Sequence, residues 1–422
     1  MKILILGAGF TGLTSALRLL EMGHSVEVIE KESAPGGLAV GVKLKDFQWS
    51  IEKHYHHLFT NDLSIINLMK NIGAGSDLIF PPSLTSIFYK DKIYPFNLPQ
   101  HILSFPPLSI TDRSRLALVS AFLKLLPRSE ALHLEKYTAT SWIRKFYGPK
   151  VFDIVWNPLL TGKFGPYVQD VNMAWFWARI KKRTFKLGYI KGGFQTLAEK
   201  LSAKVISLGG KIRYNSTFQS DPAAPAGGQL AKFDKLIITT PTSVFLKLFP
   251  QLPKIYTQNL GKIPHLHALN LLLILKKQFL KDGTYWLNIN DRKFPFIAVV
   301  EHTNYIDPKY YGNNHLVYVG NYLPTDHPYL KMSKEQLLKL FIPYLKKINP
   351  SFNYELRTIN YELFLGPFAQ PVFPINYSKH IPNFQTPLKN VYLANMDMVY
   401  PWDRGTNYAV ELGEKVAKFV NH

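Results

Sequence analysis

The chain begins with MKILILGAGFTG, residues 1–12. A short apolar run is followed by Gly7, Gly9 and Gly12 in the spacing G-x-G-x-x-G, and a helix-like stretch continues over residues 11–22. Each glycine meets a separate need. Gly7 permits a tight turn, Gly9 has no side chain to hold a pyrophosphate away from the backbone, and Gly12 lets the helix pack closely on the strands. The stretch therefore predicts a strand, a glycine turn and a helix.

The next segment supplies the rest of a nucleotide-binding unit. A second apolar run over residues 26–29 ends in Glu30, which lies 23 residues after Gly7. A carboxylate at this distance can accept hydrogen bonds from ribose hydroxyls, and the free N–H groups at the helix N-terminus favour phosphates. Because a strand lies on each side of the helix, we predict a dinucleotide site; the alternative is an ordinary βαβ turn without a ligand.

A glycine pair beyond the second strand indicates which dinucleotide binds. The sequence KESAPGG, residues 31–37, ends in Gly36 and Gly37, which suggests backbone lying close to an extended cofactor. At this point the chain resembles the FAD-binding superfamily of flavin amine oxidases, protoporphyrinogen oxidases, phytoene desaturases and UDP-galactopyranose mutases. Many members place Arg after the pair, whereas this chain has Leu38, so no cationic contact is expected there. The resemblance implies FAD as the cofactor.

The C-terminal segment carries the second part of the resemblance. Residues 390–395 are predicted as a strand, and MDMVYPWDRGTNYAV, residues 396–410, leads into the final helix. In the superfamily this strand, loop and helix close over the pyrophosphate and ribityl chain and approach the flavin ring. The alternative for Asp403 and Arg404 is a surface ion pair that caps the helix. The implied FAD contacts are Gly7, Gly9, Phe10, Thr11, Gly12, Glu30, Lys31, Gly36, Gly37, Leu38, Phe218, Asn395, Asp403, Arg404, Gly405, Thr406 and Asn407.

The alternation of predicted strands and helices along the chain is interrupted twice. We therefore predict an α/β protein with a discontinuous, Rossmann-like FAD-binding domain built from residues 1–75, 185–245 and 385–422. The two insertions, residues 76–184 and 246–384, are predicted to form an α+β substrate domain of mixed sheet and helices.

Local signals predict the elements of the insertions. Residues 86–96 read as a hairpin around Lys90-Asp91, and a later helix is expected from an N-cap at Thr111 or Asp112. Ser333 and Gln336 predict a capping box. Helical breaks are expected at Gly148-Pro149, Asn157-Pro158 and Gly165-Pro166, strands at 211–218, 233–240, 267–275, 295–301 and 315–322, a helix opened by Gly192-Gly193, and a solvent loop at 220–229.

Three histidines lie close together in EKHYHHL, residues 52–58. On a strand, His54 and His56 would share one face, with Tyr55 and His57 on the other. The superfamily places this loop beside the isoalloxazine ring, which makes His56 and His57 candidates for contact with flavin or substrate. A structural role and a metal site are the alternatives, but no motif supplies the further ligands that zinc needs, and no metal is predicted.

A second candidate catalytic pair lies in the later insertion. Glu301 and His302 end an apolar strand and could act as a base or substrate anchor facing the flavin, or could face water. Residues 158–165, PLLTGKFG, line the substrate cavity in similar proteins, or form a helix-breaking connection. Trp175 and Trp177 are expected in the core.

Bulk composition narrows the classes of partner. The formal charge is +21, from 50 basic and 29 acidic residues, which attracts anions, acidic lipid surfaces and phosphate-bearing substrates. No nucleic-acid fold signature is present, so nucleic acid is not an expected partner. Cysteine is absent, which excludes disulfides, thiolate metal sites and cysteine nucleophiles. Residues 116–126 are an apolar helix too short to span a bilayer, which favours core packing over peripheral membrane contact. A cytoplasmic location is expected.

These features favour an FAD-dependent oxidoreductase of the amine oxidase and protoporphyrinogen oxidase-like group. A small organic substrate, anionic or apolar, would bind between the domains and give a hydride to flavin N5. One alternative is a flavin-dependent, non-redox sugar-nucleotide mutase like UDP-galactopyranose mutase. Others are a polyprenoid desaturase or reductase and a flavin-free binding module. The sequence does not define the oligomeric state.

Overall fold

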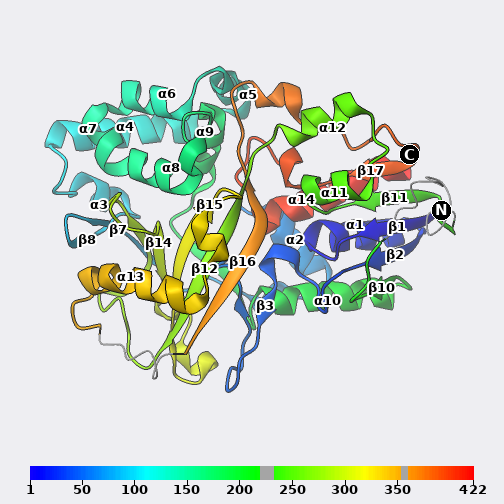
Figure 1. Cartoon of the computed structure of the whole chain (residues 1–422), viewed down its shortest axis with the longest axis horizontal. Helices are drawn as coiled ribbons and strands as arrows, with labels where there is room; N and C mark the ends of the chain where they lie inside the picture. Colours follow the sequence, from blue (N-terminus) through cyan, green and yellow to red (C-terminus); the bar gives the residue numbers. More distant parts are fainter. Residues whose placement is uncertain (219–231, 353–359) are drawn as a thin grey trace.

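The computed structural model describes residues 1–218, 232–352 and 360–422 (Figure 1). A parallel sheet with its helices lies beside a second, mixed sheet, and a separate group of helices covers one end of the mixed sheet (Figure 1). The predicted solvent loop at 220–229 falls outside the described residues.

The parallel sheet is built from three separate parts of the chain. Its strand order is β10-β2-β1-β11-β17, and all its pairings are parallel. Its strands are β1 Lys2–Leu6, β2 Ser25–Ile29, β10 Lys211–Arg213, β11 Lys235–Ile238 and β17 Val391–Leu393. The chain moves outward from β1 to β10 and then returns to β11 beside β1, so the sheet has its topological switch point between β1 and β11.

Alternation along β1 decides what covers each face of this sheet. Ile3 and Ile5 join a core with three helices, whereas Leu4 and Leu6 join a separate core on the opposite face. The first face carries α1 Phe10–Glu21, α10 Phe194–Ser207 and α14 Thr406–Asn421; the second carries α11 Thr242–Leu248 and α12 Lys254–Gly261. Burial on both faces is typical of a doubly wound sheet.

The second sheet has the order β16-β12-β15-β14-β13-β7-β8 and is antiparallel except where β13 pairs with β7. Its strands are β7 Leu84–Tyr89, β8 Lys92–Pro95, β12 His265–Leu275, β13 Thr284–Ile289, β14 Ala298–Glu301, β15 His315–Leu323 and β16 Asn360–Pro371. Helix α13, Lys334–Ile348, buries its apolar side on this sheet, and the predicted Ser333–Gln336 capping box at its start is confirmed. The predicted hairpin at 86–96 is also confirmed, as β7 and β8.

Short strands and a helix connect the two sheets. Strands β5 Leu58–Phe59 and β6 Leu78–Ile79 both pair with β9 Leu187–Ile190, and β3 Gly41–Val42 pairs with β4 Ile51–Glu52. Helix α2, Leu63–Asn71, packs against α14. One hydrophobic core joins Ile3 and Ile5 of the parallel sheet with Leu272 and Val300 of the mixed sheet. The predicted α/β fold with an inserted mixed sheet is thus present, while the domain boundaries stay a prediction.

The helical group surrounds a second aromatic core. Its helices are α3 Pro99–Leu103, α4 Ile110–Leu125, α5 Arg128–Leu132, α6 Ala139–Tyr147, α7 Pro149–Val151, α8 Asn157–Phe164 and α9 Met173–Lys182. The expected breaks at Gly148 and Gly165 are present. The expected break at Asn157-Pro158 was wrong, because a π-helical turn over Phe152–Trp156 leads directly into α8, whose first turn accepts proline without losing a hydrogen bond.

Four other local predictions need correction. The N-cap of α4 is Ser109, whose hydroxyl accepts a hydrogen bond from the Asp112 N–H, rather than Thr111 or Asp112. The strand predicted at 211–218 ends at Arg213. Residues 54–57 form no strand, because the His56 ring bends back to the His54 carbonyl.

The fourth correction concerns the apolar helix at 116–126. Leu116 and Leu123 are buried as expected, but Leu118, Phe122 and Leu125 are 71%, 54% and 79% exposed. These three lie at i, i+4 and i+7 and so form one stripe on α4. Core packing therefore explains only one side of this helix. No helix in the described residues is long and apolar enough to cross a bilayer.

Candidate flavin and substrate site

The turn after β1 requires glycine at its key positions. Gly7 has a φ of +105°, in a region that L-residues with side chains rarely adopt. A Cβ on Gly12 would lie 2.0 Å from the Gly7 carbonyl oxygen, and a Cβ on Gly37 would lie 3.2 Å from the Gly9 Cα. Thr239, just after β11, donates its hydroxyl to the Leu6 carbonyl at 2.8 Å. The glycine turn therefore stands at the switch point of the sheet, with the second glycine loop against it.

Glu30 lies where its carboxylate closes this turn. It is 8% exposed, and it accepts hydrogen bonds from the backbone N–H groups of Ala8 at 2.7 Å and Glu32 at 3.0 Å. No ion pair to Glu30 occurs in the described parts of the chain. Its carboxylate thus stands beside the glycine turn without a cationic partner.

The N-termini of α1 and α14 open toward the same region. The two helices run parallel, since Gly413 packs on the Thr11 carbonyl and Asn421 bonds His24 further along. Helix α14 begins seven residues before Gly413, so at ~1.5 Å per residue its first turn reaches about 10 Å beyond the start of α1. Neither Gly9 nor Gly405, the two N-caps, offers a side-chain cap. Both helices therefore leave N–H groups for an anion.

The other implied FAD contacts have varied surroundings. Phe218 is buried and stacks on Phe249, and the nearby Ser216 N–H bonds the Glu30 carbonyl. Lys31 is exposed and pairs with Glu32. The Asn395 amide, just after the C-terminal strand, donates hydrogen bonds to the Thr242 hydroxyl and the Thr240 carbonyl. At the start of the last helix, the Asn407 amide oxygen accepts a hydrogen bond from the Ile65 N–H. Phe10 and Thr406 are buried, and Leu38 is half-buried.

A charged cluster lies immediately before α14. Asp403 accepts hydrogen bonds from Lys163 of α8 and Arg179 of α9, both at 2.8 Å, and from the Trp175 indole at 3.3 Å. Arg404 donates its Nε to the Gln370 amide oxygen at 2.9 Å. The alternative, that Asp403 and Arg404 form a surface ion pair with each other, does not fit this geometry, because the Asp403 side chain bonds α8 and α9 and the Arg404 side chain bonds β16. The prediction that both residues contact FAD stays a prediction. We call Lys163, Arg179, Asp403 and Arg404 the cation cluster.

The three histidines contact the mixed sheet and helix α10. His54 is buried and its Nδ1 lies 2.6 Å from the Asn270 amide of β12. The rings of His57 and Tyr285 meet edge to face, and Trp286 also packs on His57. Burial lowers the pKa of His56 to about 4 and that of His57 to about 3, with nearby arginines contributing to both shifts. Both rings are therefore neutral at pH 7. The described residues contain no group of three potential metal ligands.

Glu301 and His302 are both buried in the mixed-sheet domain. The Glu301 carboxylate accepts the backbone N–H groups of Phe279 and Leu280, and His302 bonds the Tyr311 hydroxyl at 2.8 Å. Burial raises the pKa of Glu301 to about 7. Among the described residues, no hydrogen bond or ring contact joins either side chain to His56 or His57. Their hydrogen-bond partners named above lie in the loops after β12 and β14, while the His302 ring also meets Tyr189 of β9 and the Glu301 carboxylate lies 3.4 Å from His315 of β15. The two candidate pairs are therefore not in direct contact within the described residues.

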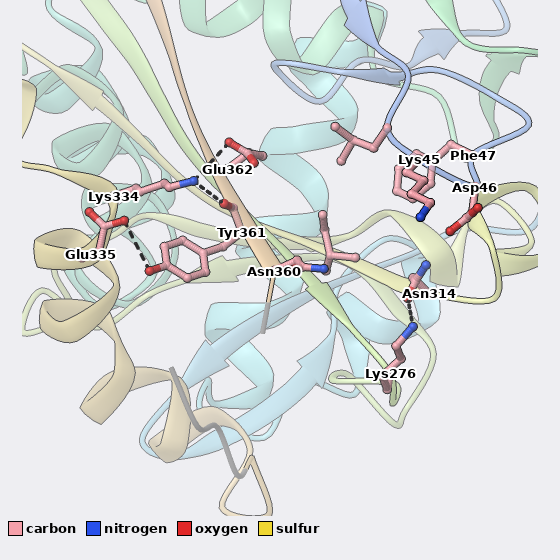
Figure 2. Close-up of a pocket in the computed structure, with 12 residues that line it drawn as sticks. Lys45, Asp46, Phe47, Lys276, Asn314, Lys334, Glu335, Asn360, Tyr361 and Glu362 are labelled. Atoms are coloured by element: carbon pink, nitrogen blue, oxygen red, sulfur yellow. Dashed lines mark hydrogen bonds and ion pairs between the residues drawn. The ribbon is translucent and has the colours of Figure 1, made fainter. Parts of the chain in front are cut away.

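An open hollow of about 510 Å³ lies elsewhere, at the far end of the mixed sheet (Figure 2). Figure 2 shows Lys334 directed at Glu362 and the Tyr361 carbonyl, and Lys276 bonded to Asn314. None of the predicted site residues lines this hollow. We therefore do not assign it to the reaction.

A sequence model of the flavin-containing amine oxidoreductases matches residues 10–421. The chain belongs to this family. Coproporphyrinogen III oxidase of Staphylococcus aureus is 25% identical over 300 residues, covering 60% of this chain and 63% of the relative. A 4,4'-diapophytoene desaturase of the same species is 24% identical over 57% of this chain and 55% of the relative. The alignments thus span less than two thirds of these relatives.

Solved structures confirm the fold over the whole chain. A putative protoporphyrinogen oxidase from an Exiguobacterium species has a TM-score of 0.75 at 15% identity, covering 100% of this chain and 98% of that one. A reduced UDP-galactopyranose mutase has a TM-score of 0.74 at 17% identity, covering 99% and 95%. The family contains flavin, and the glycine cradle beside two uncapped helix N-termini fits a group of that kind.

Sequence reasoning did not assign roles to several residues that the fold gathers here. Lys163 lies within residues 158–165, whose sequence indicates only a cavity lining or a helix-breaking connection. Arg179 lies on the same helix as Trp175 and Trp177, and no sequence pattern assigns it a role. Trp175 is buried as expected, and its indole N–H also donates a hydrogen bond to Asp403. No sequence pattern places Tyr322 or Gln370 in the site, because their positions depend on the pairing of distant strands.

Proposed function

We propose that this protein is an FAD-dependent oxidoreductase that takes a hydride from a small organic substrate. The observation that carries the proposal is the convergence of α1 and α14, whose uncapped N-termini flank the glycine turn at the switch point of the parallel sheet. An extended dinucleotide can place its central pyrophosphate at the N–H groups of α1, while the N-terminus of α14, about 10 Å further on, can reach its flavin part. The likeness to oxidases and desaturases supports redox chemistry.

Each part of the proposed site has a stated task. The N–H groups of Gly9 to Gly12 hold the pyrophosphate, Glu30 holds the ribose hydroxyls, and the N–H groups after Gly405 approach the flavin end. The bound flavin supplies the hydride acceptor, N5. His56 and His57, neutral and backed by aromatic rings, border the substrate and exclude water from it. Glu301 and His302 support the loops of the substrate domain.

The proposal is tested first by the colour of the purified protein. We expect a visible flavin spectrum that bleaches when the right substrate is added without oxygen. Arg404→Ala should lower the FAD content, because it removes a cation beside the α14 N-terminus, while Arg144→Ala, which breaks an exposed pair with Asp153, should leave it unchanged. Colourless protein that refuses added FAD would refute the proposal. Turnover that requires prior reduction but consumes no electrons would instead indicate a mutase.

We also propose that the protein works at a lipid surface. The exposed stripe of Leu118, Phe122 and Leu125 supports this. The C-terminus of α4 is tied to the basic segment 180–183, since Lys124 donates to the carbonyls of residues 180 and 181. Phe185, two residues after this segment, is 63% exposed. Apolar side chains among lysines and arginines suit an anionic phospholipid surface.

A further inference from the structure

The cation cluster contains more positive charge than its one carboxylate can balance. Lys163 and Arg179 share a single oxygen of Asp403, each at 2.8 Å. Arg404 has no acidic side-chain partner among the described residues, and its guanidinium bonds a neutral amide, that of Gln370. When Lys163 is protonated, three cations therefore meet one anion, which leaves a surplus of two positive charges.

Aromatic rings hold these cations in place from two sides. The Lys163 ammonium lies 4.9 Å from the centre of the Trp175 ring, and Arg404 lies 4.8 Å from that of Tyr322. Arg179 also packs over Trp175, at 5.8 Å. Rings on α9 and β15 thus fix the directions of the charged groups and keep water from part of their surface.

Burial makes the surplus charge unfavourable. The Lys163 side chain is 10% exposed and that of Asp403 is 21% exposed. Burial lowers the pKa of Lys163 to about 7; Asp403 raises it, and the neighbouring Arg179 and Arg404 lower it further. A partly buried cation that lacks a full partner is stabilised by any anion that reaches it.

We propose that the cation cluster binds an anionic group of the substrate, a carboxylate or a phosphate. This rests on the proposed function, since the cluster adjoins Gly405 and the flavin end of the site. Lys163 and Arg179 come from the inserted helices α8 and α9, whereas the pyrophosphate of the cofactor is assigned to the turn at Gly9. The cluster thus takes its ligand from the substrate side, where the charges of both domains meet.

The test measures anion binding by calorimetry to the FAD-loaded protein, with inorganic pyrophosphate and succinate as separate probes. We expect at least one probe to bind at millimolar concentration or below. Lys163→Met should weaken it about tenfold or more, the loss of a charge-assisted hydrogen bond, while Lys163→Arg should retain it. Lys309→Met, which removes an exposed lysine paired with Asp307, is the matched control and should change nothing. The stronger probe tells phosphate from carboxylate.

Binding should also depend on pH with a defined sign. Lys163 faces Asp403 and Arg404 of the C-terminal loop, Arg179 of α9, and the rings of Trp175 and Tyr322. Lys163 titrates near pH 7 whereas an arginine in its place stays protonated, so for either probe the affinity of wild type relative to Lys163→Arg should fall as the pH rises above about 7. The comparison cancels the ionisation of pyrophosphate itself, which changes over the same range.

The outcomes separate this inference from the proposed function. If the yellow protein binds neither probe, or if Lys163→Met binds both as tightly as wild type, the inference is overturned. It is also overturned if Lys163→Met loses FAD while anion binding persists, because the lysine then serves the cofactor. If the protein is colourless, the proposed function fails, but the calorimetric comparison of Lys163→Met with Lys309→Met still decides whether the cluster binds anions.

Discussion

Glu52 shows how one side chain can be buried in this fold without an ion-pair partner. It is 0% exposed and accepts hydrogen bonds from the Phe194 N–H at the start of α10 and from the Tyr189 hydroxyl, both within 2.8 Å. Burial raises the pKa of Glu52 to about 7, although these bonds lower it in part. The Glu52 carboxyl links the segment before His54 to the N-terminus of α10, and this link positions the histidines that follow.

This shift predicts a pH dependence of stability. Between the ordinary pKa of 4.5 and about 7, the folded protein keeps the Glu52 proton that the unfolded chain has lost. The folded state then binds more protons, so the free energy of unfolding falls as the pH rises through this range, by about 3 kcal/mol from this group.

Urea unfolding of wild type and Glu52→Gln from pH 4.5 to 8 checks this prediction. The glutamine has no such proton to lose, so the stability of wild type relative to the variant should decrease as the pH rises, and the variant should gain most at pH 8. Glu301 and Asp62, whose pKa values burial also raises, contribute equally to both proteins. A difference that stays constant with pH would show that Glu52 is ionised throughout.

At the same scale, the sequence predicted the glycines but not the cation cluster. Gly7 and Gly12 are constrained by backbone geometry a few residues away, so a local pattern can reveal them. Lys163, Arg179 and Arg404 are separated by up to 241 positions. Lys163 and Arg179 share the Asp403 carboxylate, and Lys163 and Arg404 both lie over the Tyr322 ring. These contacts follow from how α8, α9, β15 and the last loop pack, which no spacing rule encodes.

Among the elements, α4 departs most clearly from an amphipathic core helix. It turns Leu116 and Leu123 inward but leaves Leu118, Phe122 and Leu125 in solvent. From the sequence, the apolar side chains of α4 could be either buried or exposed. The packing of α9 and α6 against one side of α4 decides which of them are buried. Large exposed apolar side chains in one stripe mark a contact surface.

We predict that α4 binds anionic membranes. Wild-type protein should sediment with vesicles containing phosphatidylglycerol and remain free with pure phosphatidylcholine, because the stripe supplies apolar area and the neighbouring lysines supply charge attraction. Changing Leu118, Phe122 and Leu125 to Ser should abolish the sedimentation. The control changes Ile206 and Ile255, which are 53% and 68% exposed on other helices, to Ser and should retain it. Sedimentation of the triple variant at the wild-type level would contradict the prediction.

The paired helices α1 and α14 show the opposite case, in which element-level prediction succeeds. Each has a glycine N-cap and an apolar side, and both are readable from short stretches at the two ends of the chain. What the sequence could not supply is their parallel packing through Gly413, where a Cβ would lie 2.6 Å from the Thr11 carbonyl. That close approach sets the N-terminus of α14 beyond that of α1 and so decides the length of ligand that the pair can hold.

At the scale of the molecule, the two sheets share one hydrophobic core. Ile3 and Ile5 of the parallel sheet and Leu272, Val300 and Tyr318 of the mixed sheet belong to the same buried cluster. The inserted segments contribute to a hydrophobic core that they share with the parallel sheet. They cannot unfold without exposing that core to water. Although three separate parts of the chain form the parallel sheet, the whole should therefore behave as one cooperative unit.

This coupling predicts how the cofactor stabilises the protein. FAD stripped from the protein and then added back binds only the folded state, so it should raise the midpoint of thermal unfolding; an excess of 100 times its Kd contributes about 2.7 kcal/mol. Because the core is shared, circular dichroism and tryptophan fluorescence should report the same single transition with and without FAD. Most of the tryptophans lie in the inserted regions, so fluorescence follows the part of the chain distant from the glycine turn. Two transitions, of which only the circular dichroism one moves with FAD, would show that the insertions fold independently.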